Sequence, residues 1–231
     1  MIGIIAAEFE EMNAIRGYMT NCIEEVVYNL KLYKGIIKNK ECVIVQCGVG
    51  KVNAARTAQI LIDKYNVEYV VNIGSAGSVT HALDIGDIVI GTELVQYDFD
   101  ITGIGDYEKG EIFEVGKLFY SDKRLIELCK ESIQSENDNE NKMMLGRIGT
   151  ADLFCSDPEI HKRVKDEFDV LCVEMEGAAI GQVCTLDNIP FLVIRSISDT
   201  PNGNNKVDFH IYLEHASQKA AEILYNLIEK I

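Results

Sequence analysis

Short, continuously apolar runs alternate along this chain with segments of helical periodicity, and this alternation constrains the fold more than any other feature. The runs are typical of buried strands, and they occupy residues 2–7, 41–47, 69–73, 88–95, 170–173 and 189–194. Apolar side chains between 209 and 231 recur at the spacing of a terminal helix. Because parallel strands need crossover segments that are usually helices, we predict a single α/β domain, residues 1–231, with a largely parallel sheet.

Four charged side chains follow two of these runs. Glu174 and Glu176 come after one run, and Arg195 and Asp199 come at the end of the next. If both runs are strands, their carboxyl ends bring these side chains to the sheet edge where open α/β sheets bind ligands. Three acids and a guanidinium suit a polyhydroxyl substrate and proton transfer. The alternative is a solvated loop of mixed charge. It is less favoured because acids that directly follow buried strands usually have a function.

Three acids, Glu8, Glu10 and Glu11, follow the first run. Acidic residues suit the first turn of a helix, because the helix dipole is positive there. This explanation covers most of the three. It leaves room for one of them to point inward over the strand end instead.

Two loops of small residues are predicted after strands, at 48–51 (Gly-Val-Gly-Lys) and 74–78 (Gly-Ser-Ala-Gly-Ser). Small residues leave room for a planar ring beside the backbone, and a glycine turn before a helix can bring a ligand to backbone N–H groups. Neither loop has the spacing of a phosphate-binding or dinucleotide fingerprint. Each one alone is also compatible with a tight turn, but two such loops favour a binding site.

Charge and cysteine usage exclude several classes of function. The net charge of −15 disfavours nucleic-acid binding, because the surface repels phosphates. Seven cysteines without a Cys-x-x-Cys pair favour a reducing cytoplasm over a disulfide framework. We expect no signal peptide and no membrane span, since the apolar runs are short. The four histidines lack metal-ligand spacing, so we expect no metal.

Six motifs occur in the order in which one enzyme family has them. They are Gly3-Ile4-Ile5-Ala6-Ala7 with Glu10-Glu11, Gly48-Val49-Gly50-Lys51-Val52, Asn72-Ile73-Gly74-Ser75-Ala76-Gly77, Gly86-Asp87-Ile88-Val89, Val173-Glu174-Met175-Glu176 and Arg195-Ser196-Ile197-Ser198-Asp199. Over almost its whole length the chain resembles the 5′-methylthioadenosine/S-adenosylhomocysteine nucleosidases of the nucleoside phosphorylase superfamily. The resemblance implies a three-layer domain with a central mixed sheet flanked by helices, a homodimer, and no cofactor.

The resemblance also implies hydrolysis of the N-glycosidic bond of an adenine thionucleoside, giving adenine and a thioribose. Glu11 would be the general base that activates water. Asp199, positioned by Ser198, would be the general acid that protonates N7 of adenine. Glu176 would bind the ribose hydroxyls, with Met175 packing under the sugar.

Further contacts with the substrate follow from the same resemblance. Ser75 and Arg195 would help to hold the water and the ribose. Phe154 would stack on adenine, and the backbone of Cys155 would bond its edge. The remaining substrate-binding residues are expected to be Val49, Ala76, Gly77, Phe209 and, from the strand-end argument, Glu174.

Cleavage of a nucleoside C–N bond places positive charge on the sugar and negative charge on the base, so nearby carboxylates and an acid suit it. Burial and neighbouring carboxylates would raise the pKa of Asp199, as an acid requires. Asp199→Asn is therefore expected to abolish turnover in a folded protein. A phosphorylase would need cations near the first strand, where this chain has acids instead.

Two departures from the family pattern bear on the 5′ substituent. Glu8 stands where the family usually has methionine, and the loop after Tyr107 lacks the usual proline-containing segment. Two alternatives therefore stay open. One is a nucleosidase for another 5′-modified nucleoside, such as futalosine or 5′-deoxyadenosine. The other is a non-catalytic nucleoside-binding protein, which would not need a base placed at the water.

Overall fold

The computed structural model describes residues 1–134, 141–201 and 205–231. The polar segment 135–142, predicted as an exposed connection, falls mostly outside them. The strands within the described residues are β1 (Ile2–Ala6), β2 (Thr20–Val27), β3 (Leu30–Ile37), β4 (Lys40–Gln46), β5 (Tyr69–Ser78), β6 (Ile88–Gln96), β7 (Phe119–Tyr120), β8 (Met143–Thr150), β9 (Val170–Glu174) and β10 (Phe191–Asp199). The helices are α1 (Phe9–Arg16), α2 (Lys51–Tyr65), a short 3₁₀ turn at Thr102–Ile104, α3 (Lys123–Gln134), α4 (Pro158–Phe168), α5 (Gly177–Leu186) and α6 (Asn205–Lys230).

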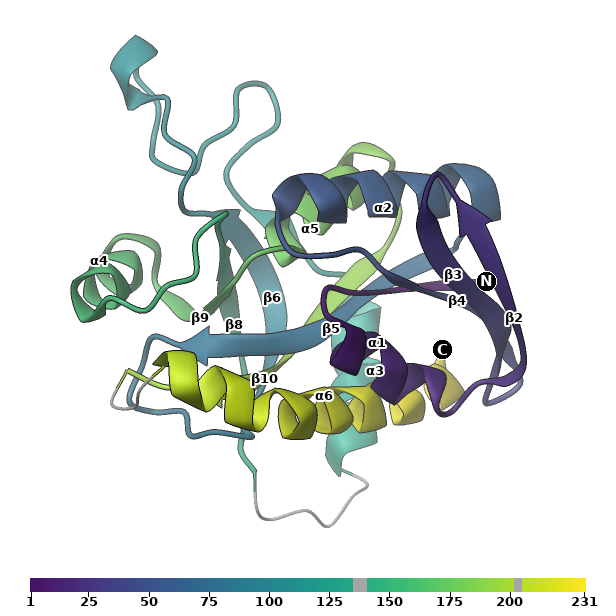
Figure 1. The fold of residues 1–231 in the computed structure, drawn as a ribbon. Helices are drawn as coiled ribbons and strands as arrows, with labels where there is room; N and C mark the ends of the chain where they lie inside the picture. The colour runs from purple at the N-terminus through teal and green to yellow at the C-terminus, as the bar shows by residue number, and fades with distance from the viewer. Residues whose placement is uncertain (135–140, 202–204) are drawn as a thin grey trace.

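The strands form one mixed sheet in the order β10-β6-β8-β9-β5-β1-β4-β3-β2, with β7 on β6 (Figure 1). Strand β5 also pairs with β10, so β5, β10, β6, β8 and β9 close into a ring. The prediction of a largely parallel sheet is wrong. Among the described residues, parallel pairs such as β1–β5 and β5–β10 are matched by as many antiparallel ones. Hairpins join β2, β3 and β4, and β6 and β9 also run antiparallel to β10 and β5, respectively.

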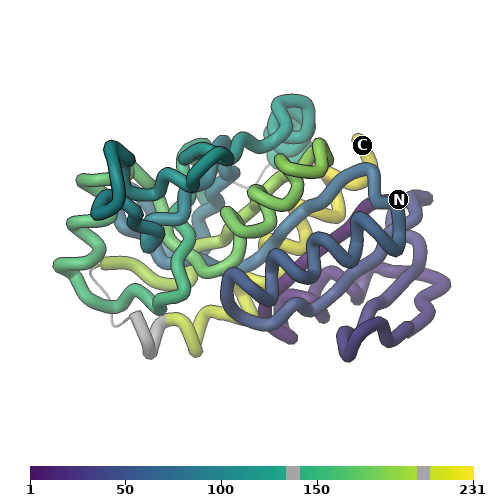
Figure 2. Tube along the Cα trace, turned by 90° about the horizontal axis from the view of Figure 1, so that it is seen from above, coloured from purple at the N-terminus to yellow at the C-terminus, as the bar shows by residue number. Residues whose placement is uncertain are grey.

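Helices cover both faces of the sheet, which gives the predicted three layers. Alternate residues of β1 show this arrangement, because successive side chains of a strand point to opposite faces. Ile5 packs in a core with α2 and α5, whereas Ile4 packs in a second core with α1, α3 and α6. Helices α2 and α5 lie side by side on the first face (Figure 2).

Two local predictions from the sequence are confirmed: Lys38-Asn39-Lys40 predicts a hairpin, and Asp157-Pro158 predicts the start of a helix with Asp157 as its cap. Lys38 and Asn39 both have positive φ, 48° and 65°, as a two-residue hairpin between β3 and β4 requires. Asp157 caps α4, because its carboxylate accepts a hydrogen bond from the N–H of Glu159 at 2.9 Å.

The small-residue segment 74–78 is not a loop, as the sequence predicted, but the second half of β5. Likewise Arg195 and Asp199 lie within β10 rather than beyond it. The two segments pair in parallel from Gly74 onward, with an irregularity between Ile197 and Asp199. Strand pairing between neighbours far apart in sequence therefore extends both strands past their apolar runs. Strands β2 and β7 were not predicted.

None of the helices in the described part of the chain combines the length and apolar character needed to cross a bilayer.

Candidate active site

A cavity of about 320 Å³ opens at the carboxyl ends of β1, β5, β9 and β10. Its described walls are Ala7, Glu8, Glu11, Val49, Ser75, Ala76, Gly77, Leu153, Phe154, Cys155, Val173, Glu174, Met175, Glu176, Ser198, Asp199 and Phe209. All of the predicted site residues line this cavity except Arg195, which is buried behind it. Position at a sheet edge thus brings together side chains that are far apart in the sequence.

Glu11 is the acid of the first helix that points inward. Only 4% of its surface is exposed. One carboxylate oxygen accepts from the backbone N–H groups of Ala7 and Glu8, each at 3.0 Å. The other accepts from the N–H of Ser75 at 2.9 Å and from its hydroxyl at 3.1 Å. Four donors, two from the turn that follows β1 and two from Ser75 on β5, therefore fix this carboxylate over the end of the sheet.

Asp199 ends β10 and is 2% exposed. The hydroxyl of Ser198 donates to its Oδ1 at 2.8 Å, so the neighbouring serine fixes the orientation of the carboxyl group. The positioning role that the resemblance implied for Ser198 would use this hydrogen bond.

Two glycines of β5 make room for these acids. A Cβ atom on Gly74 would lie 2.8 Å from Oε1 of Glu11, and one on Gly77 would lie 2.8 Å from Oδ2 of Asp199. Both distances are shorter than any normal van der Waals contact. The small residues predicted to admit a planar ring thus also admit the two carboxylates that flank the cavity.

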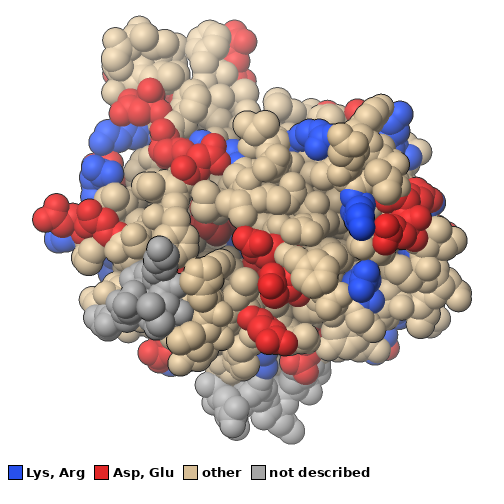
Figure 3. Space-filling view, viewed as in Figure 1, with Lys and Arg blue, Asp and Glu red and all other residues tan. Residues whose placement is uncertain are grey.

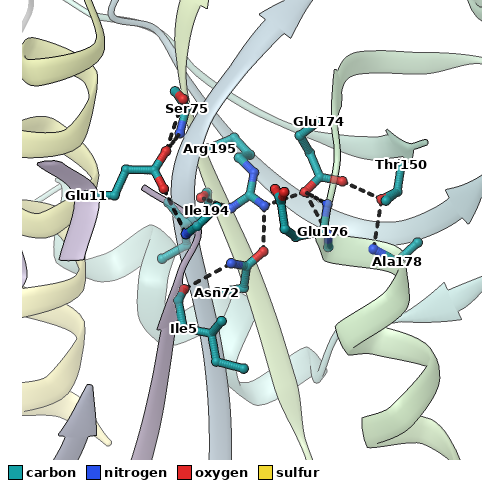
Figure 4. Close-up of polar contacts among 12 residues, drawn as sticks. Ile5, Glu11, Asn72, Ser75, Thr150, Glu174, Glu176, Ala178, Ile194 and Arg195 are labelled. Atoms are coloured by element: carbon teal, nitrogen blue, oxygen red, sulfur yellow. Dashed lines mark hydrogen bonds and ion pairs between the residues drawn. The ribbon is translucent and has the colours of Figure 1, made fainter. Parts of the chain in front are cut away.

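Arg195 joins several strands beneath the cavity (Figure 4). It is 1% exposed and forms an ion pair with Glu174. Its guanidinium also donates to the side-chain oxygen of Asn72, whose amide donates to the backbone oxygen of Ile5. Asn72 belongs to one of the family motifs, but no role was predicted for it. Its position in an apolar run was the signal, because a buried amide needs partners.

The glycine turn before α2 holds carboxylates through its backbone. Gly50 donates its N–H to Glu176 at 2.8 Å, and Lys51 donates its N–H to Asp152 at 2.8 Å. Helix N-termini favour negative charge, because their first N–H groups lack helical partners. These two groups thus anchor side chains of the protein, where the sequence predicted a ligand.

Burial raises the pKa of Glu176 to about 8, and the neighbouring charge of Glu174 contributes in the same direction. Arg195 and the N–H of Gly50 oppose this shift without cancelling it. A buried carboxyl group that is costly to ionise is suited to a ligand that donates hydrogen bonds to it.

Aromatic and aliphatic side chains form the other walls. The rings of Phe154 and Phe209 meet edge to face, with centroids 5.7 Å apart. Val49 and Leu153 are partly exposed beside them. An apolar wall opposite hydrogen-bonding groups suits a flat heterocycle joined to a polar sugar.

Five carboxylates and no lysine, arginine or histidine are among the described residues that line the cavity. Acidic side chains also gather in the middle of the face in Figure 3. The electrostatic environment therefore disfavours anionic ligands. In the described part of the chain, no group of three or more histidine, cysteine or acidic side chains is arranged to hold a metal ion.

Comparison with known proteins decides the family. The sequence model of the phosphorylase superfamily matches residues 1–229. A 5′-methylthioadenosine/S-adenosylhomocysteine nucleosidase of Staphylococcus aureus is 36% identical over 232 aligned residues, which cover 100% of both chains. The chain belongs to this nucleosidase family.

Solved structures agree with this assignment. The nucleosidase of S. pneumoniae with a transition-state inhibitor has a TM-score of 0.93 at 36% identity, over 99% of this chain and 98% of that one. A futalosine hydrolase mutant of Helicobacter pylori has a TM-score of 0.94 at 29% identity, over 100% of this chain and 99% of that one. The fold of this chain is therefore shared by enzymes that are named for different nucleoside substrates.

We predict that Gly77→Ala lowers turnover by this member of the nucleosidase family roughly 100-fold, because the added Cβ displaces the carboxyl group of Asp199 and small displacements of reacting groups are costly. The turnover number and the urea unfolding midpoint check this. Gly103→Ala is the matched control, because no atom lies within 4 Å of the Cβ position there. Normal turnover by Gly77→Ala would show that Asp199 tolerates displacement.

The raised pKa of Glu176 predicts a pH dependence of stability. Between about 4.5, the ordinary pKa, and about 8, the folded protein keeps a proton that the unfolded chain has released. This group's contribution to stability therefore falls as pH rises through that window. Glu176→Gln removes the contribution, so the variant should gain stability relative to the parent from the lower to the upper end of the window.

Urea unfolding of both proteins at each end of the window measures this difference. A difference that does not change with pH would mean that Glu176 ionises normally in the folded protein.

Proposed function

We propose that this chain hydrolyses the N-glycosidic bond of 5′-methylthioadenosine and S-adenosylhomocysteine, releasing adenine and the thioribose. The observation that carries the proposal is that Glu11, Glu176 and Asp199 face one cavity. Glu11 lies far from the other two acids in the sequence, and all three are buried. The named activities of the relatives support the same substrate class.

Asp199 acts on the base. The C–N bond breaks more easily when N7 of adenine takes a proton, because the leaving group then departs neutral. Ser198 holds one oxygen of the Asp199 carboxyl group, so the group is directed before the substrate arrives. Phe154 supports the base by stacking, with the backbone of Cys155 at its edge.

Glu176 acts on the sugar. Its carboxylate accepts hydrogen bonds from the ribose hydroxyls, while Met175 packs beneath the ring. Positive charge develops on the ribose as the bond breaks, and nearby carboxylates stabilise it. The ribose hydroxyls donate hydrogen bonds to the ionised form of Glu176, whose pKa is raised by burial. Binding of the sugar therefore favours ionisation of Glu176 and lowers its pKa.

Glu11 acts on water. Its carboxylate takes a proton from the water that attacks the sugar carbon, and the hydroxyl of Ser75 lies 3.1 Å from the same carboxylate. Arg195 acts indirectly in this proposal, because it lies behind the cavity and pairs with Glu174. Five carboxylates with no cation among the described lining residues favour water over phosphate as the nucleophile.

A different 5′-modified nucleoside is the second candidate. Glu8 forms part of the cavity wall, and burial, with Glu11 as a further cause, raises its pKa. The structural similarity to a futalosine hydrolase of H. pylori favours keeping this alternative. A non-catalytic binding protein is disfavoured, since binding alone does not require Glu11 at the water position.

The experiment that tests the function measures adenine release from 5′-methylthioadenosine, S-adenosylhomocysteine, 5′-deoxyadenosine and futalosine, each with and without phosphate. For futalosine, release of its own base is measured. We expect the two thionucleosides to give the highest kcat/KM, unchanged by phosphate.

Asp199→Asn serves as the catalytic control and should be slower by at least about 100-fold, the usual contribution of a general acid. Strict dependence on phosphate would indicate a phosphorylase. A preference for futalosine would favour the second candidate function. Tight binding without cleavage would indicate a non-catalytic nucleoside-binding protein.

We also propose that the chain forms a homodimer in the cytoplasm and serves the salvage of adenine and of the methylthio group. The segment 97–118 extends away from the body (Figure 1), and it exposes Ile104 and Phe113. Lys51 and Asp98 pair at the base of this segment, close to the exposed Val52. Large exposed apolar side chains on a projecting segment suit a protein interface. All seven cysteines are free thiols, which suits a reducing compartment.

Phe113→Asp is expected to shift the dimer to monomer in sedimentation velocity, because a charge would be buried at the interface. Ile23→Asp is the matched control: Ile23 is exposed on β2, at the far end of the sheet order. Equal effects of the two substitutions, or a monomeric parent protein, would contradict the interface.

A further inference from the structure

We propose that Thr150 is a positioning residue for the sugar: its hydroxyl orients Glu174, which fixes the turn that presents Glu176, a role that rests on the nucleosidase function proposed above. Thr150 ends β8 and is fully buried. It does not line the cavity, and no pattern in the sequence predicted a role for it.

Glu174 lines the cavity, but the protein already uses both of its oxygens. Oε2 accepts from the guanidinium of Arg195 and from the N–H groups of Glu176 at 3.1 Å and Gly177 at 2.6 Å. Oε1 accepts from the hydroxyl of Thr150. Because protein groups already use both oxygens, this carboxylate stabilises the turn after β9 more than it binds a ligand.

The Thr150 hydroxyl makes two hydrogen bonds, which Figure 4 shows side by side. It donates to Glu174 and accepts from the N–H of Ala178 at 2.8 Å. Gly177 and Ala178 lie in the first turn of α5, where N–H groups have no helical acceptor. Glu174 and Thr150 together supply the missing acceptors and tie α5 to β8 and β9.

Glu176 contacts both the turn after β9 and the glycine turn before α2. Its N–H is bonded to Glu174, and its side chain is bonded to Gly50. Loss of the Thr150 hydroxyl would leave an oxygen of Glu174 and the N–H of Ala178 without a partner in a buried region, which favours a rearrangement of the turn. The direction of Glu176 would then change.

The base-binding side of the cavity depends on other contacts. Asp199 is oriented by Ser198 on β10. The loop that carries Phe154 starts at Ala151, whose N–H donates to the backbone oxygen of Glu174 at 3.1 Å without using the Thr150 hydroxyl. The proposal therefore separates recognition of the sugar from recognition of adenine.

The test is calorimetric titration of adenine and of 5′-methylthioadenosine into proteins that carry Asp199→Asn, so that the nucleoside is retained. Thr150→Val keeps the shape of the side chain and removes the hydroxyl. It should weaken binding of the nucleoside about tenfold, the scale of a hydrogen bond to a charged group, and change adenine binding by less than about twofold. Thr150→Ser should restore the nucleoside affinity.

Thr57→Val is the matched control, because Thr57 is equally buried in α2 and its hydroxyl has no hydrogen-bond partner among the described residues. It should leave both affinities unchanged. Equal weakening of both ligands by Thr150→Val, unchanged nucleoside binding, or failure of Thr150→Ser to restore it would overturn the proposal.

If Thr150→Val does not fold, Thr150→Ala takes its place under the same criteria. If the parent protein releases no adenine although the titrations give the expected pattern, the nucleosidase function fails and the positioning role stands.

Discussion

The buried ion pair of Arg195 and Glu174 is the interaction on which the arrangement of the site depends. Among the lysines and arginines in the described part of the chain, Arg195 alone is buried. It lies under a cavity that is lined by five carboxylates. Acids packed this closely repel one another and lose hydration, so ionised forms need a compensating charge or donors. Arg195 supplies that charge and links β10 to β9 and, through Asn72, to β5 and β1.

Backbone N–H groups supply the rest of the compensation. Glu11 is held by the N–H groups of Ala7, Glu8 and Ser75, and Glu176 by that of Gly50. Ends of parallel strands and first turns of helices offer such groups in excess, because the chain leaves its regular hydrogen bonding there. The same edge can thus hold several acids close together without a matching number of cations.

Prediction from sequence succeeded where the signal was local. Short-range patterns predicted the hairpin at Lys38 and Asn39, the cap at Asp157 and, apart from β2 and β7, the order of the strands. It failed for 74–78, where glycines and serines suggested a loop. That segment is a strand because β10 pairs with it along its length, and such pairing overrides the weak local preference of small residues.

The candidate site shows the same division. Thirteen of the predicted residues line the cavity, because motifs of a family with known chemistry marked them; their catalytic roles remain proposals. Arg195 was predicted at the substrate and lies behind it. Asn72 and Thr150 escaped functional assignment. A polar side chain in a buried strand signals that it needs hydrogen-bond partners, but the sequence does not show which groups they are.

The sequence by itself determined which side chains are available: acids after three strands, glycines in β5, and an apolar pattern that needs helices on both sheet faces. Only the tertiary structure decided that Glu11 meets Ser75, that Glu174 takes Thr150 as a donor, and that β5 closes a ring with β10. The physical reason is that these contacts follow from strand order and register. Hydrophobic periodicity specifies which face of a strand is buried, but not which distant strand lies beside it.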